Sequence, residues 1–356
     1  MFDPLIINSH RGAYSVYFRK CISDDLCLAE DSQRHYIVDA NVARLHSPLL
    51  KHVLSRPSTL LIEASEESKG LEAVLPIYRK LISSKVRRGH VLFAIGGGVI
   101  QDITCFIAST LLRGLAWHFA PTTLLAQADS CIGSKSSINF SNIKNIIGTF
   151  NPPRSVYIWP GFLQTLRPVD IKSGLGEMIK AHIIDGADSF DRISRNISHI
   201  YNDDNYLLRY INASLHIKRE YVEKDEFDLG IRNLFNYGHS FGHAIESATS
   251  YSIPHGIAVT IGMDMANFIA VEQGLLSSEH FYRMHQTLRS NYEDCASLQL
   301  KTDRLFDALT RDKKNTSDKL KLILPIGENA KVQIVDVPFD ESFKGQCSNF
   351  LSTLNT

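Results

Sequence analysis

The chain has 356 residues, which is enough for two domains that each bury a core of their own. Apolar residues make up 44% of it and charged residues 21%, the balance of an ordinary soluble globular protein. Its 38 basic side chains equal its 38 acidic ones, so no overall field favours nucleic acid or an anionic membrane. Any affinity for an anion must therefore be local.

From its N-terminal residues and its cysteines we expect a cytoplasmic protein. The opening residues lack the basic head and long apolar core of a signal peptide, and apolar runs such as 91–95 are far too short to cross a membrane. The six cysteines form no Cys-x-x-Cys pair and no framework spacing. We expect them to be reduced and mostly buried, as in the cytoplasm.

The first ninety residues alternate short apolar runs with amphipathic segments. The periodicity predicts strands at 14–19, 36–39 and 59–63 and helices at 47–54 and 71–84. Strands that alternate with helices favour a parallel sheet covered by helices.

A glycine-rich turn follows the predicted strand 91–95. The sequence Gly96-Gly-Gly-Val-Ile-Gln-Asp102 leads into a helical pattern that continues to about residue 112. Glycines at the start of a helix let backbone N–H groups approach a phosphate, and the helix dipole adds to the attraction. The turn is therefore a candidate dinucleotide cradle, although a plain tight turn has the same pattern.

Polar groups collect after the next predicted strand, 115–119. Residues 121–129 supply two threonines and Asp129, and the glycine-spaced segment 130–148 supplies Lys135 and Lys144. Ligands of doubly wound sheets bind where strand ends gather, and such a segment can hold an anionic substrate. The alternative is a solvated loop. Asn151-Pro-Pro-Arg154 then breaks the pattern, and we expect the domain boundary there.

The second half of the chain is mainly helical. Helices are predicted at 169–185, 207–223, 256–270, 281–290 and 302–310, followed by a strand-like run at 320–324 and a frayed polar end of about ten residues. Glu177 and Lys180 share a face of the first of these helices, which by itself is also the pattern of a surface ion pair.

Three histidines gather in the segment 232–255. His239 and His243 stand one helical turn apart, and the Pro254-His255-Gly256 turn can bring His255 beside them. Such a group is either a metal site or a set of core histidines. Two imidazoles with a carboxylate, for which Glu177 is the obvious candidate, leave an open metal position for substrate.

A dinucleotide cradle and an open metal site together favour oxidation of an alcohol. The cations near these motifs exceed what one carboxylate needs, which indicates a substrate with a phosphate as well as an acid group. These cations are Lys135, Lys144, Lys180, Lys218, Arg232 and Lys314.

Taken together, these motifs resemble the 3-dehydroquinate synthase family of sugar phosphate cyclases. They are Gly96–Asp102, Arg113-Gly114, Pro121–Lys135, Lys144-Asn145, Gly176–Lys180 and Asn236–His243, in family order. The resemblance implies an α/β fold: an N-terminal Rossmann-like parallel-sheet NAD-binding domain, residues 1–155, and a C-terminal mainly α-helical metal- and substrate-binding domain, residues 156–356. It also implies a homodimer with its active site in a cleft.

The family reaction uses NAD catalytically and needs a divalent metal. A hydroxyl is oxidised to a ketone, phosphate is eliminated, the ketone is reduced again, and the opened sugar closes by an intramolecular aldol step. Oxidation comes first because a ketone acidifies the neighbouring C–H bond.

The resemblance also implies a role for individual residues. The metal ligands are Glu177, His239 and His255, which moves His243 from the metal to the substrate phosphate. Catalytic positions are Lys180, His243, Asn236, Lys135, Arg232 and Lys218. Substrate contacts add Asp129, Lys144, Asn145, Lys314 and, from the neighbouring subunit, Arg113. Cofactor contacts are Asp39 and Asn41 for adenosine, Glu66 and Lys69 for ribose, Gly97, Gly98 and Asp102 for pyrophosphate, and Thr122, Thr123, Phe162 and Thr165 for nicotinamide.

Four positions depart from the usual family pattern: Gln101, Ser134, Ser136 and Phe235. They leave open a cyclase of another sugar phosphate, such as sedoheptulose 7-phosphate or an amino analogue. Because Lys218, Arg232, Asn236 and His243 are all present, we expect an acid substrate, the 3-deoxy-heptulosonate 7-phosphate of the shikimate route. A metal-dependent polyol dehydrogenase is the alternative in another reaction class, and the ligand set suits zinc and cobalt alike.

Overall fold

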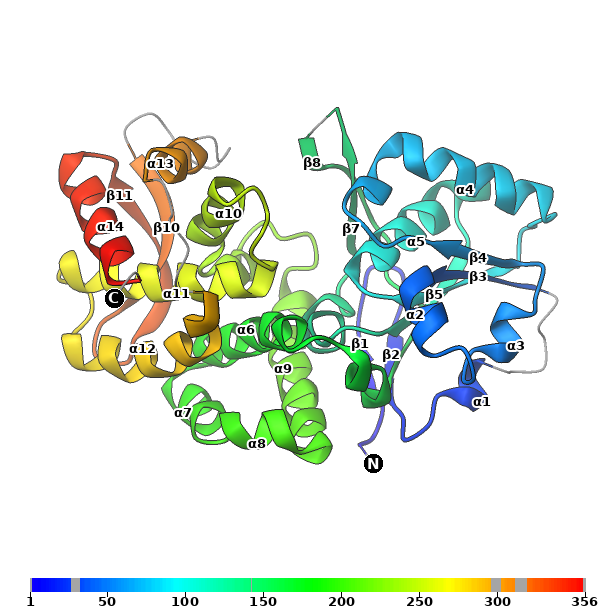
Figure 1. The fold of residues 1–356 in the computed structure, drawn as a ribbon, viewed down its shortest axis with the longest axis horizontal. Coiled ribbons are helices and arrows are strands. Elements are labelled where there is room, and N and C mark those ends of the chain that lie inside the picture. Colours follow the sequence, from blue (N-terminus) through cyan, green and yellow to red (C-terminus); the bar gives the residue numbers. More distant parts are fainter. Residues whose placement is uncertain (1, 27–32, 142, 296–301, 311–318, 355–356) are drawn as a thin grey trace. The chain divides into compact units, whose positions relative to one another are not determined.

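The computed structural model describes residues 2–26, 33–141, 143–295, 302–310 and 319–354 (Figure 1). The chain forms two compact units: unit 1 is residues 1–167 with 218–228, and unit 2 is residues 168–217 with 229–356. The sequence-based division into 1–155 and 156–356 lies twelve residues earlier and lacks the second segment of unit 1. The segment 156–167 joins unit 1 because it completes the sheet of that unit.

Unit 1 is built on a seven-stranded sheet with the order β1-β2-β9-β6-β5-β3-β4. Its strands are β1 (Leu5–Ile7), β2 (Tyr14–Phe18), β3 (Arg34–Asp39), β4 (Thr59–Ile62), β5 (Val91–Gly96), β6 (Ala116–Pro121) and β9 (Ser155–Ile158). Every pair is parallel except β1 with β2. The central strands are buried on both faces, as expected for a parallel sheet, and the predicted Rossmann-like class is confirmed.

Helices cover the sheet of unit 1 on both faces (Figure 1). They are α1 (Ser23–Leu26), α2 (Ala40–Leu45), α3 (Lys51–Leu54), α4 (Leu71–Ser83) and α5 (Gly98–Thr110). The core between them is aromatic and aliphatic, with Tyr36, Phe93 and Phe162 fully buried. The prediction of one helix over 47–54 is wrong for its first half, because only Lys51–Leu54 is helical there.

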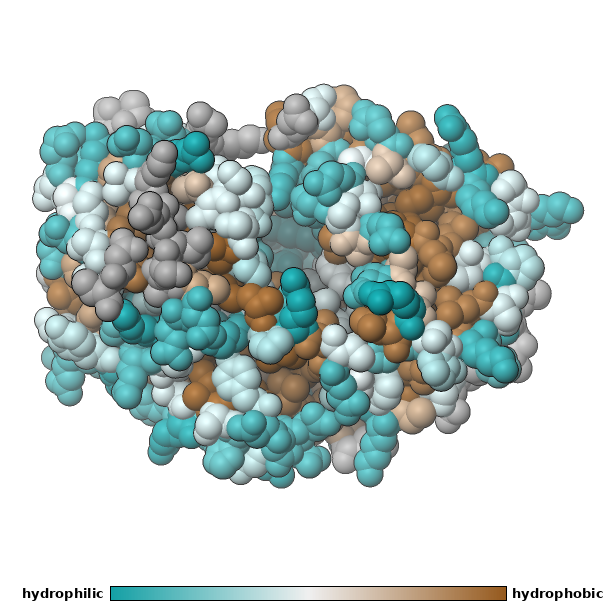
Figure 2. All heavy atoms as spheres, in the orientation of Figure 1, coloured by the Kyte–Doolittle hydropathy of each residue, from teal (hydrophilic) through white to brown (hydrophobic). Residues whose placement is uncertain are grey.

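A two-stranded hairpin stands outside the sheet, where the sequence predicts a loop. It consists of β7 (Lys135–Phe140) and β8 (Ile143–Phe150), paired antiparallel. Phe140, Ile143 and Ile146 near its tip are more than two-fifths exposed. Figure 2 shows that apolar side chains also lie among hydrophilic ones elsewhere on the face that it draws.

An isolated two-stranded hairpin is only marginally stable in water, so contacts outside β7 and β8 must hold this one.

Unit 2 is mainly helical, as predicted. Its helices are α6 (Pro168–Asp185), α7 (Ala187–Arg195), α8 (Ile197–Asn202), α9 (Asp204–Lys224, in unit 1 from Lys218 on), α10 (His239–Ala248), α11 (His255–Glu272), α12 (Ser278–Tyr292), α13 (Thr302–Thr310) and α14 (Glu341–Thr353). A hairpin of β10 (Lys319–Ile326) and β11 (Lys331–Pro338) accompanies them. Among the described residues, no helix has the length and apolar composition needed to span a bilayer.

The last described residues form helix α14, so the prediction of a frayed end is wrong as far as residue 353. Asp340 caps α14 by accepting from the backbone N–H of Phe343 at 2.9 Å. Phe343, Cys347 and Phe350 recur at helical spacing and are buried. The sequence analysis overlooked these three apolar residues because most of their neighbours are polar. Their burial against the rest of unit 2 stabilises the helix.

Candidate active site

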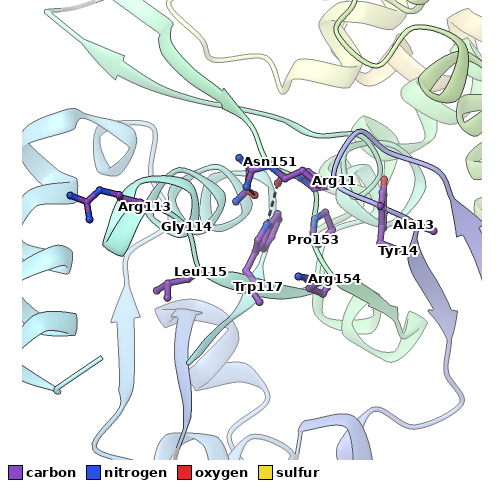
Figure 3. Close-up of a pocket in the computed structure, with 13 residues that line it drawn as sticks. Arg11, Ala13, Tyr14, Arg113, Gly114, Leu115, Trp117, Asn151, Pro153 and Arg154 are labelled. Atoms are coloured by element: carbon purple, nitrogen blue, oxygen red, sulfur yellow. Dashed lines mark hydrogen bonds between the residues drawn. The ribbon is translucent and has the colours of Figure 1, made fainter. Parts of the chain in front are cut away.

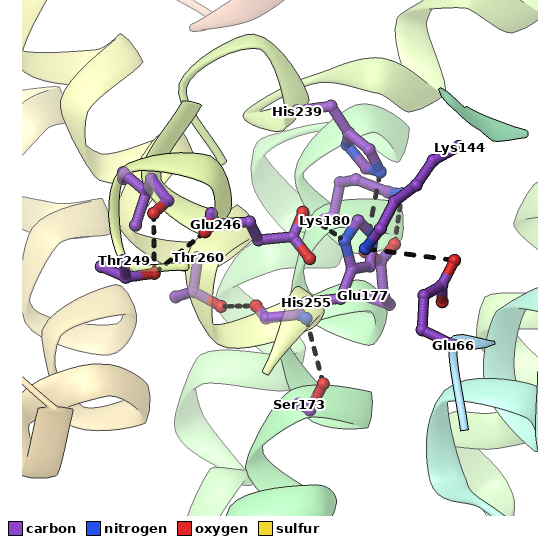
Figure 4. A network of polar contacts seen from close by, with 12 residues as sticks. Glu66, Lys144, Ser173, Glu177, Lys180, His239, Glu246, Thr249, His255 and Thr260 are labelled. Atoms are coloured by element: carbon purple, nitrogen blue, oxygen red, sulfur yellow. Dashed lines mark hydrogen bonds and ion pairs between the residues drawn. The ribbon is translucent and has the colours of Figure 1, made fainter. Parts of the chain in front are cut away.

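Three helices of unit 2 bring the predicted metal ligands together (Figure 4). Glu177 lies in the middle of α6, while His239 and His255 are the first residues of α10 and α11. Gly238 precedes His239 with a left-handed backbone (φ 77°), which a side chain at that position would disfavour. Pro254 starts α11 with a preset backbone angle, so both histidines are fixed at helix starts.

Close backbone contact of α6 and α11 explains why Glu177 meets His255. A Cβ on Gly256 would lie 1.8 Å from the carbonyl oxygen of Ser173, and one on Gly176 would lie 2.3 Å from that of Gly256. The Gly256 N–H also donates to Ser173 Oγ at 3.0 Å. Only glycine permits this approach, and each glycine is next in sequence to a predicted metal ligand.

The same device holds α10 against α11. A Cβ on Gly262 would lie 2.1 Å from the carbonyl oxygen of Gly238, and one on Gly242 would lie 3.0 Å from Val259 Cα. His239 and His255, sixteen residues apart, thereby have ring centroids 5.2 Å apart. The position of the imidazoles follows from backbone packing rather than from side-chain contacts alone.

A buried carboxylate oxygen faces both histidines. Glu177 is 2% exposed, and its Oε1 lies 3.5 Å from His255 Nε2 and 3.8 Å from His239 Nε2. Within the described residues this oxygen has no hydrogen-bond partner. Ligands of a tetrahedral zinc with bonds of about 2.0–2.1 Å lie roughly 3.3 Å apart. The three atoms therefore have the spacing that suits a divalent cation, and the carboxylate oxygen among them lacks a hydrogen-bond donor.

His243 offers a second donor set. Its ring lies 5.3 Å from that of His239 and 5.7 Å from that of His255, and the three histidines have possible ligand atoms within 4.8 Å of one another. However, the His243 side chain is exposed, whereas Glu177 Oε1 is buried and unsatisfied. A cation bound by Glu177, His239 and His255 would satisfy this buried oxygen, whereas the exposed His243 can be satisfied by water.

Hydrogen bonds fix the histidine rings from behind. His239 Nδ1 lies 3.2 Å from the carbonyl oxygen of Tyr237, which can only accept, so the Nε2 of neutral His239 carries the free lone pair. Burial, followed by the nearby Lys180, holds the pKa of His239 well below its ordinary value. The Tyr237 hydroxyl in turn donates to Asn267 in the core.

Glu246 is a residue of this site that the sequence analysis missed. Its Oε2 lies 3.1 Å from His255 Nδ1, so the carboxylate orients the ring whose Nε2 faces Glu177. Burial lowers the pKa of His255, but Glu246 and Glu177 outweigh it and raise the pKa overall. The signal was available, because Glu246 follows His243 by three residues on the same helix face.

Lys180 completes the charged core of unit 2. It is 2% exposed, and its ammonium is paired with Glu177 Oε2. The Phe235 ring, one of the departures from the family pattern, lies 5.6 Å from the same ammonium, in the range of a cation–π contact. Arg232 is also buried, and Asn236 follows in the same short helix, Ile231–Asn236. The predicted ion pair thus exists, but it is buried rather than superficial.

Unit 1 gathers the predicted cofactor residues at the carboxyl ends of its strands. Asp39 ends β3, Gly97 and Gly98 follow β5, and Thr122 and Thr123 follow β6. A Cβ on Gly98 would meet no atom within 4 Å, while one on Gly97 would lie 3.0 Å from Thr123 Cγ2. No side chain caps the start of α5. An open helix start with bare glycines can accept a phosphate.

Three predicted cofactor residues already have structural contacts. Asp39 Oδ1 caps α2 by accepting from the N–H of Asn41 at 2.8 Å. Phe162 is buried in the core of unit 1, and Thr165 Oγ1 lies 2.9 Å from His46 Nε2. Their contacts to adenosine and nicotinamide stay predictions.

The predicted substrate residues of unit 1 form ion pairs. Lys218 Nζ lies 2.9 Å from Asp129 Oδ1, Lys135 is paired with Asp228, and Lys144 Nζ is 4.0 Å from Glu66 Oε1. Burial raises the pKa of Asp102, which Lys69 opposes at 2.7 Å. Lys314 lies outside the described residues.

Arg113 lies apart from these residues. It lines a cavity of about 290 Å³ at the amino-terminal ends of β2, β6 and β9, whereas the cofactor residues lie at the carboxyl ends of the strands (Figure 3). Leu112 and Arg113 both have left-handed backbones, with φ of 54° and 66°. Two such residues in succession are strained, and strain of this kind is common at functional positions.

Gln101, the first departure from the family pattern, has a structural partner. Its amide nitrogen donates to the carbonyl oxygen of Ser130 at 2.6 Å, and Ser130 Oγ donates back to its oxygen at 2.6 Å. Gln101 thereby ties the cradle helix α5 to the residue that follows Asp129.

Comparisons with known proteins identify the family of the chain. Residues 59–173 match the family description 3-dehydroquinate synthase N-terminal, and residues 174–315 match 3-dehydroquinate synthase C-terminal. The 3-dehydroquinate synthase of Acetivibrio thermocellus is 38% identical over 283 residues, 78% of this chain and 79% of that protein. That of Thermoanaerobacter sp. is 34% identical over 96% of this chain and 99% of its own length.

Solved structures of two cyclases and of an alcohol dehydrogenase share the fold. The 2-epi-5-epi-valiolone synthase ValA from Streptomyces hygroscopicus, solved with NAD+ and Zn2+, has a TM-score of 0.83 and 26% identity and covers 96% of each chain. A 2-deoxy-scyllo-inosose synthase covers 98% of this chain with a TM-score of 0.82 and 23% identity, and an iron-containing alcohol dehydrogenase covers 95% with 0.62 and 12%.

These relatives define an enzyme of the phosphate-eliminating carbon–oxygen lyase type within the sugar phosphate cyclases. The chain belongs to the 3-dehydroquinate synthase family. The resemblance predicted from the motifs is confirmed.

Proposed function

We propose that the chain converts 3-deoxy-D-arabino-heptulosonate 7-phosphate to 3-dehydroquinate and phosphate. The observation that carries this is the unsatisfied buried Glu177 Oε1 facing two imidazole nitrogens, within a family whose similar members bear that name. A cluster of histidines satisfied inside a core would leave no such oxygen.

Glu177, His239 and His255 would hold the divalent metal, zinc or cobalt. The glycine turn at Gly97 and Gly98 would hold the NAD pyrophosphate. When bound, the metal lowers the pKa of a substrate hydroxyl, and NAD exchanges a hydride with the same carbon. Both groups are proposed for this chain by analogy with ValA, which was solved with NAD+ and Zn2+.

The protein side chains have roles that need no metal. Lys180, fixed by Glu177 and by the Phe235 ring, supplies a buried positive charge for developing oxyanions. His243 is exposed and not needed for the metal, so it can carry a proton to the departing phosphate. Arg232 and Asn236 would bind the acid group, and Lys144 with Asn145 the sugar phosphate.

A cyclase of another sugar phosphate is the second candidate. Two observations favour it: the similar solved structures include a valiolone synthase and an inosose synthase, and Gln101 and Phe235 depart from the family pattern with definite structural contacts. The buried Arg232 supports the acid substrate, because a guanidinium can bind a carboxylate through two parallel hydrogen bonds.

Phosphate release from a panel of substrates separates these candidates. The purified protein, with zinc or cobalt and catalytic NAD+, is offered 3-deoxy-D-arabino-heptulosonate 7-phosphate, sedoheptulose 7-phosphate and glucose 6-phosphate. We expect release, and a product of the mass of dehydroquinate, only from the first. Release only from sedoheptulose 7-phosphate would overturn the substrate, and steady NADH formation from a polyol would indicate a dehydrogenase instead.

We also propose a cytoplasmic homodimer in which Arg113 serves the neighbouring subunit. The strained, exposed Arg113 and the buried thiols of Cys105, Cys131 and Cys347 support this. Mixing inactive Arg113→Ala and Lys180→Ala proteins should restore partial activity, because one site of each mixed dimer would have both residues. If the mixture stays inactive although mixed dimers form, Arg113 does not act across subunits.

A further inference from the structure

The hairpin of unit 1 contains a bulge at the two residues proposed to contact the sugar phosphate. Ile138 pairs with Ile147, and Phe140 pairs with Ile143, so Asn139 alone faces residues 144–146. Asn145 has a left-handed backbone with φ of 53°. Residues of a bulge lose their regular cross-strand partners. Lys144 and Asn145 thus stand in the least regular part of an exposed hairpin and need other contacts to be fixed.

The side chain of Asn139 supplies the missing contact. Its Oδ1 accepts from the backbone N–H of Asn145 at 2.9 Å. Its Nδ2 donates to Glu66 Oε1 at 2.7 Å and to the Glu66 carbonyl oxygen at 3.2 Å. The orientation of the amide follows from its partners, because a flipped amide would oppose donor to donor and acceptor to acceptor. One carboxamide therefore joins the bulge to the segment that begins with Glu66.

A second bridge runs between the same two regions. The buried Lys69 donates to Asn145 Oδ1 at 2.9 Å and pairs with Asp102 Oδ2 at 2.7 Å. Ser137 Oγ donates to Asn145 Oδ1 at 2.9 Å, and the Ser137 N–H donates to Asp102 Oδ1 at 3.2 Å. The bulge is thus tied to three of the residues proposed to bind the dinucleotide. The backbone of Asn139 also forms a β-bridge with Gly70, and the Asn139 side chain adds a contact to the backbone of Asn145.

We propose that Asn139 is a positioning residue that couples the two ligands. It holds Lys144 and Asn145 in place for the sugar phosphate and holds Glu66 in place for the dinucleotide. A dinucleotide that fixes Glu66 and Lys69 also fixes the bulge, so the sugar phosphate then loses less conformational entropy on binding. This inference rests on the proposed function of Lys144, Asn145, Glu66 and Lys69.

Two substitutions separate the two ends of the amide. Asn139→Ala removes both contacts. Asn139→Asp keeps an acceptor for the Asn145 N–H but places a carboxylate against that of Glu66, so it breaks only the contact on the cofactor side. Thr149→Val is the matched control, because it removes a side-chain contact of the same hairpin, to Ser136 Oγ at 3.0 Å, away from the bulge.

The full-length protein is tested in three ways, and the thermal unfolding midpoint of each variant is measured as well. Hydrogen exchange by mass spectrometry follows the peptide 143–147, titration gives the Kd for NAD+ without sugar phosphate, and phosphate release from 3-deoxy-D-arabino-heptulosonate 7-phosphate gives kcat and KM. For Asn139→Ala we expect about tenfold faster exchange, about tenfold weaker NAD+ binding and about tenfold higher KM, with kcat changed less. Asn139→Asp should weaken NAD+ binding while exchange stays near that of the wild type.

The outcomes distinguish this inference from the proposed function. If the wild-type protein releases no phosphate, the proposed function fails, and exchange and the NAD+ titration still decide the role of Asn139. If Asn139→Ala exchanges and binds NAD+ like Thr149→Val, Asn139 does not position these residues. A purely structural role would lower the thermal unfolding midpoint and kcat together without separating the two substitutions, which would also overturn the inference.

Discussion

The two units hold their proposed ligands by different physical means. In unit 2 the ligands stand on helices whose backbones touch at Gly176, Gly256 and Gly262, so their positions depend on helix packing. In unit 1 Lys144 and Asn145 stand on an exposed hairpin whose bulge is held by hydrogen bonds from the side chains of Asn139 and Lys69. Packing of the first kind is all-or-none, whereas hydrogen bonds of the second kind each contribute only about 1 kcal/mol. The difference suggests a rigid metal site and an adjustable substrate contact.

The largest effect is expected for the carboxylate at the centre of unit 2. Glu177→Gln keeps the shape of the side chain but removes the charge, so bound metal should be lost and phosphate release should fall by ~10³-fold or more. It also leaves buried Lys180 without its partner, which lowers stability. Metal content by elemental analysis and phosphate release check this, with the exposed Glu341→Gln as control. A variant that retains both metal and activity would contradict the proposed ligand set.

The second-largest effect is expected for the contact between helices α6 and α11. Gly256→Ala forces a methyl group into the Ser173 carbonyl oxygen, because the Cβ would lie 1.8 Å from it, and should lower the free energy of unfolding by about 3 kcal/mol or more. Gly345→Ala in α14 is the matched control, since its Cβ would meet nothing within 4 Å and should stabilise the protein by about 0.5–1 kcal/mol. Urea unfolding measures both. Equal unfolding midpoints would show that the contact of α6 with α11 is not tight.

The third prediction concerns Glu246, which contacts the proposed metal ligand His255 from the side away from Glu177. Glu246→Gln removes the charge that orients His255, and we expect the affinity for zinc or cobalt to fall about 10- to 100-fold while the fold is retained. Competition with a chelator measures the affinity, and the absorption spectrum of the cobalt form should shift as the ring reorients. An unchanged spectrum and affinity would show that packing alone positions His255.

The smallest effect concerns pH and one histidine from each unit, the partly buried His118 and the buried His182. Burial lowers the pKa of His118 in unit 1 to about 4 and that of His182 in unit 2 to about 4. The unfolded chain takes up these protons near pH 6.5, whereas the folded chain takes them up only near pH 4. Their contribution to the free energy of unfolding is therefore highest above pH 6.5 and falls as the pH drops from about 6.5 to 4. His118→Phe should flatten the fall of the thermal midpoint over that range, and His52→Gln on the surface should not. A slope unchanged by His118→Phe would contradict the assignment.

Much of the fold was predictable because the signals are local. The strands before the glycine turn, the helix 71–84 and the helical second half follow from periodicity and turn chemistry. The hairpin β7–β8 was predicted as a loop, because its polar and glycine-spaced sequence lacks alternation and β8 is exposed on both faces. The edge strand β1 was missed because three residues give no periodicity.

The site was predictable to the extent that the motifs name its residues. Spacing alone paired His239 with His243, and the family resemblance replaced this pair with His239, His255 and Glu177. Asn139 was missed because its role depends on a contact across two strands, which no local pattern shows. Glu246 shares a helix face with His243, but its contact with His255 on another helix needed the structure. Gln101 was recognised as a departure, but its bond to Ser130 needed the structure.

The bulge opposite Asn139 has a consequence for how substrate range could change in evolution. At this point one strand already carries three residues against one, so the ladder on either side does not depend on equal strand lengths. Insertions or deletions there would change the length of the hairpin and the side chains that it offers to the sugar. The pairing of Lys135 with Phe150 at the base would stay the same. Helices joined by touching backbones offer no such freedom, so new specificities should arise in the hairpin first.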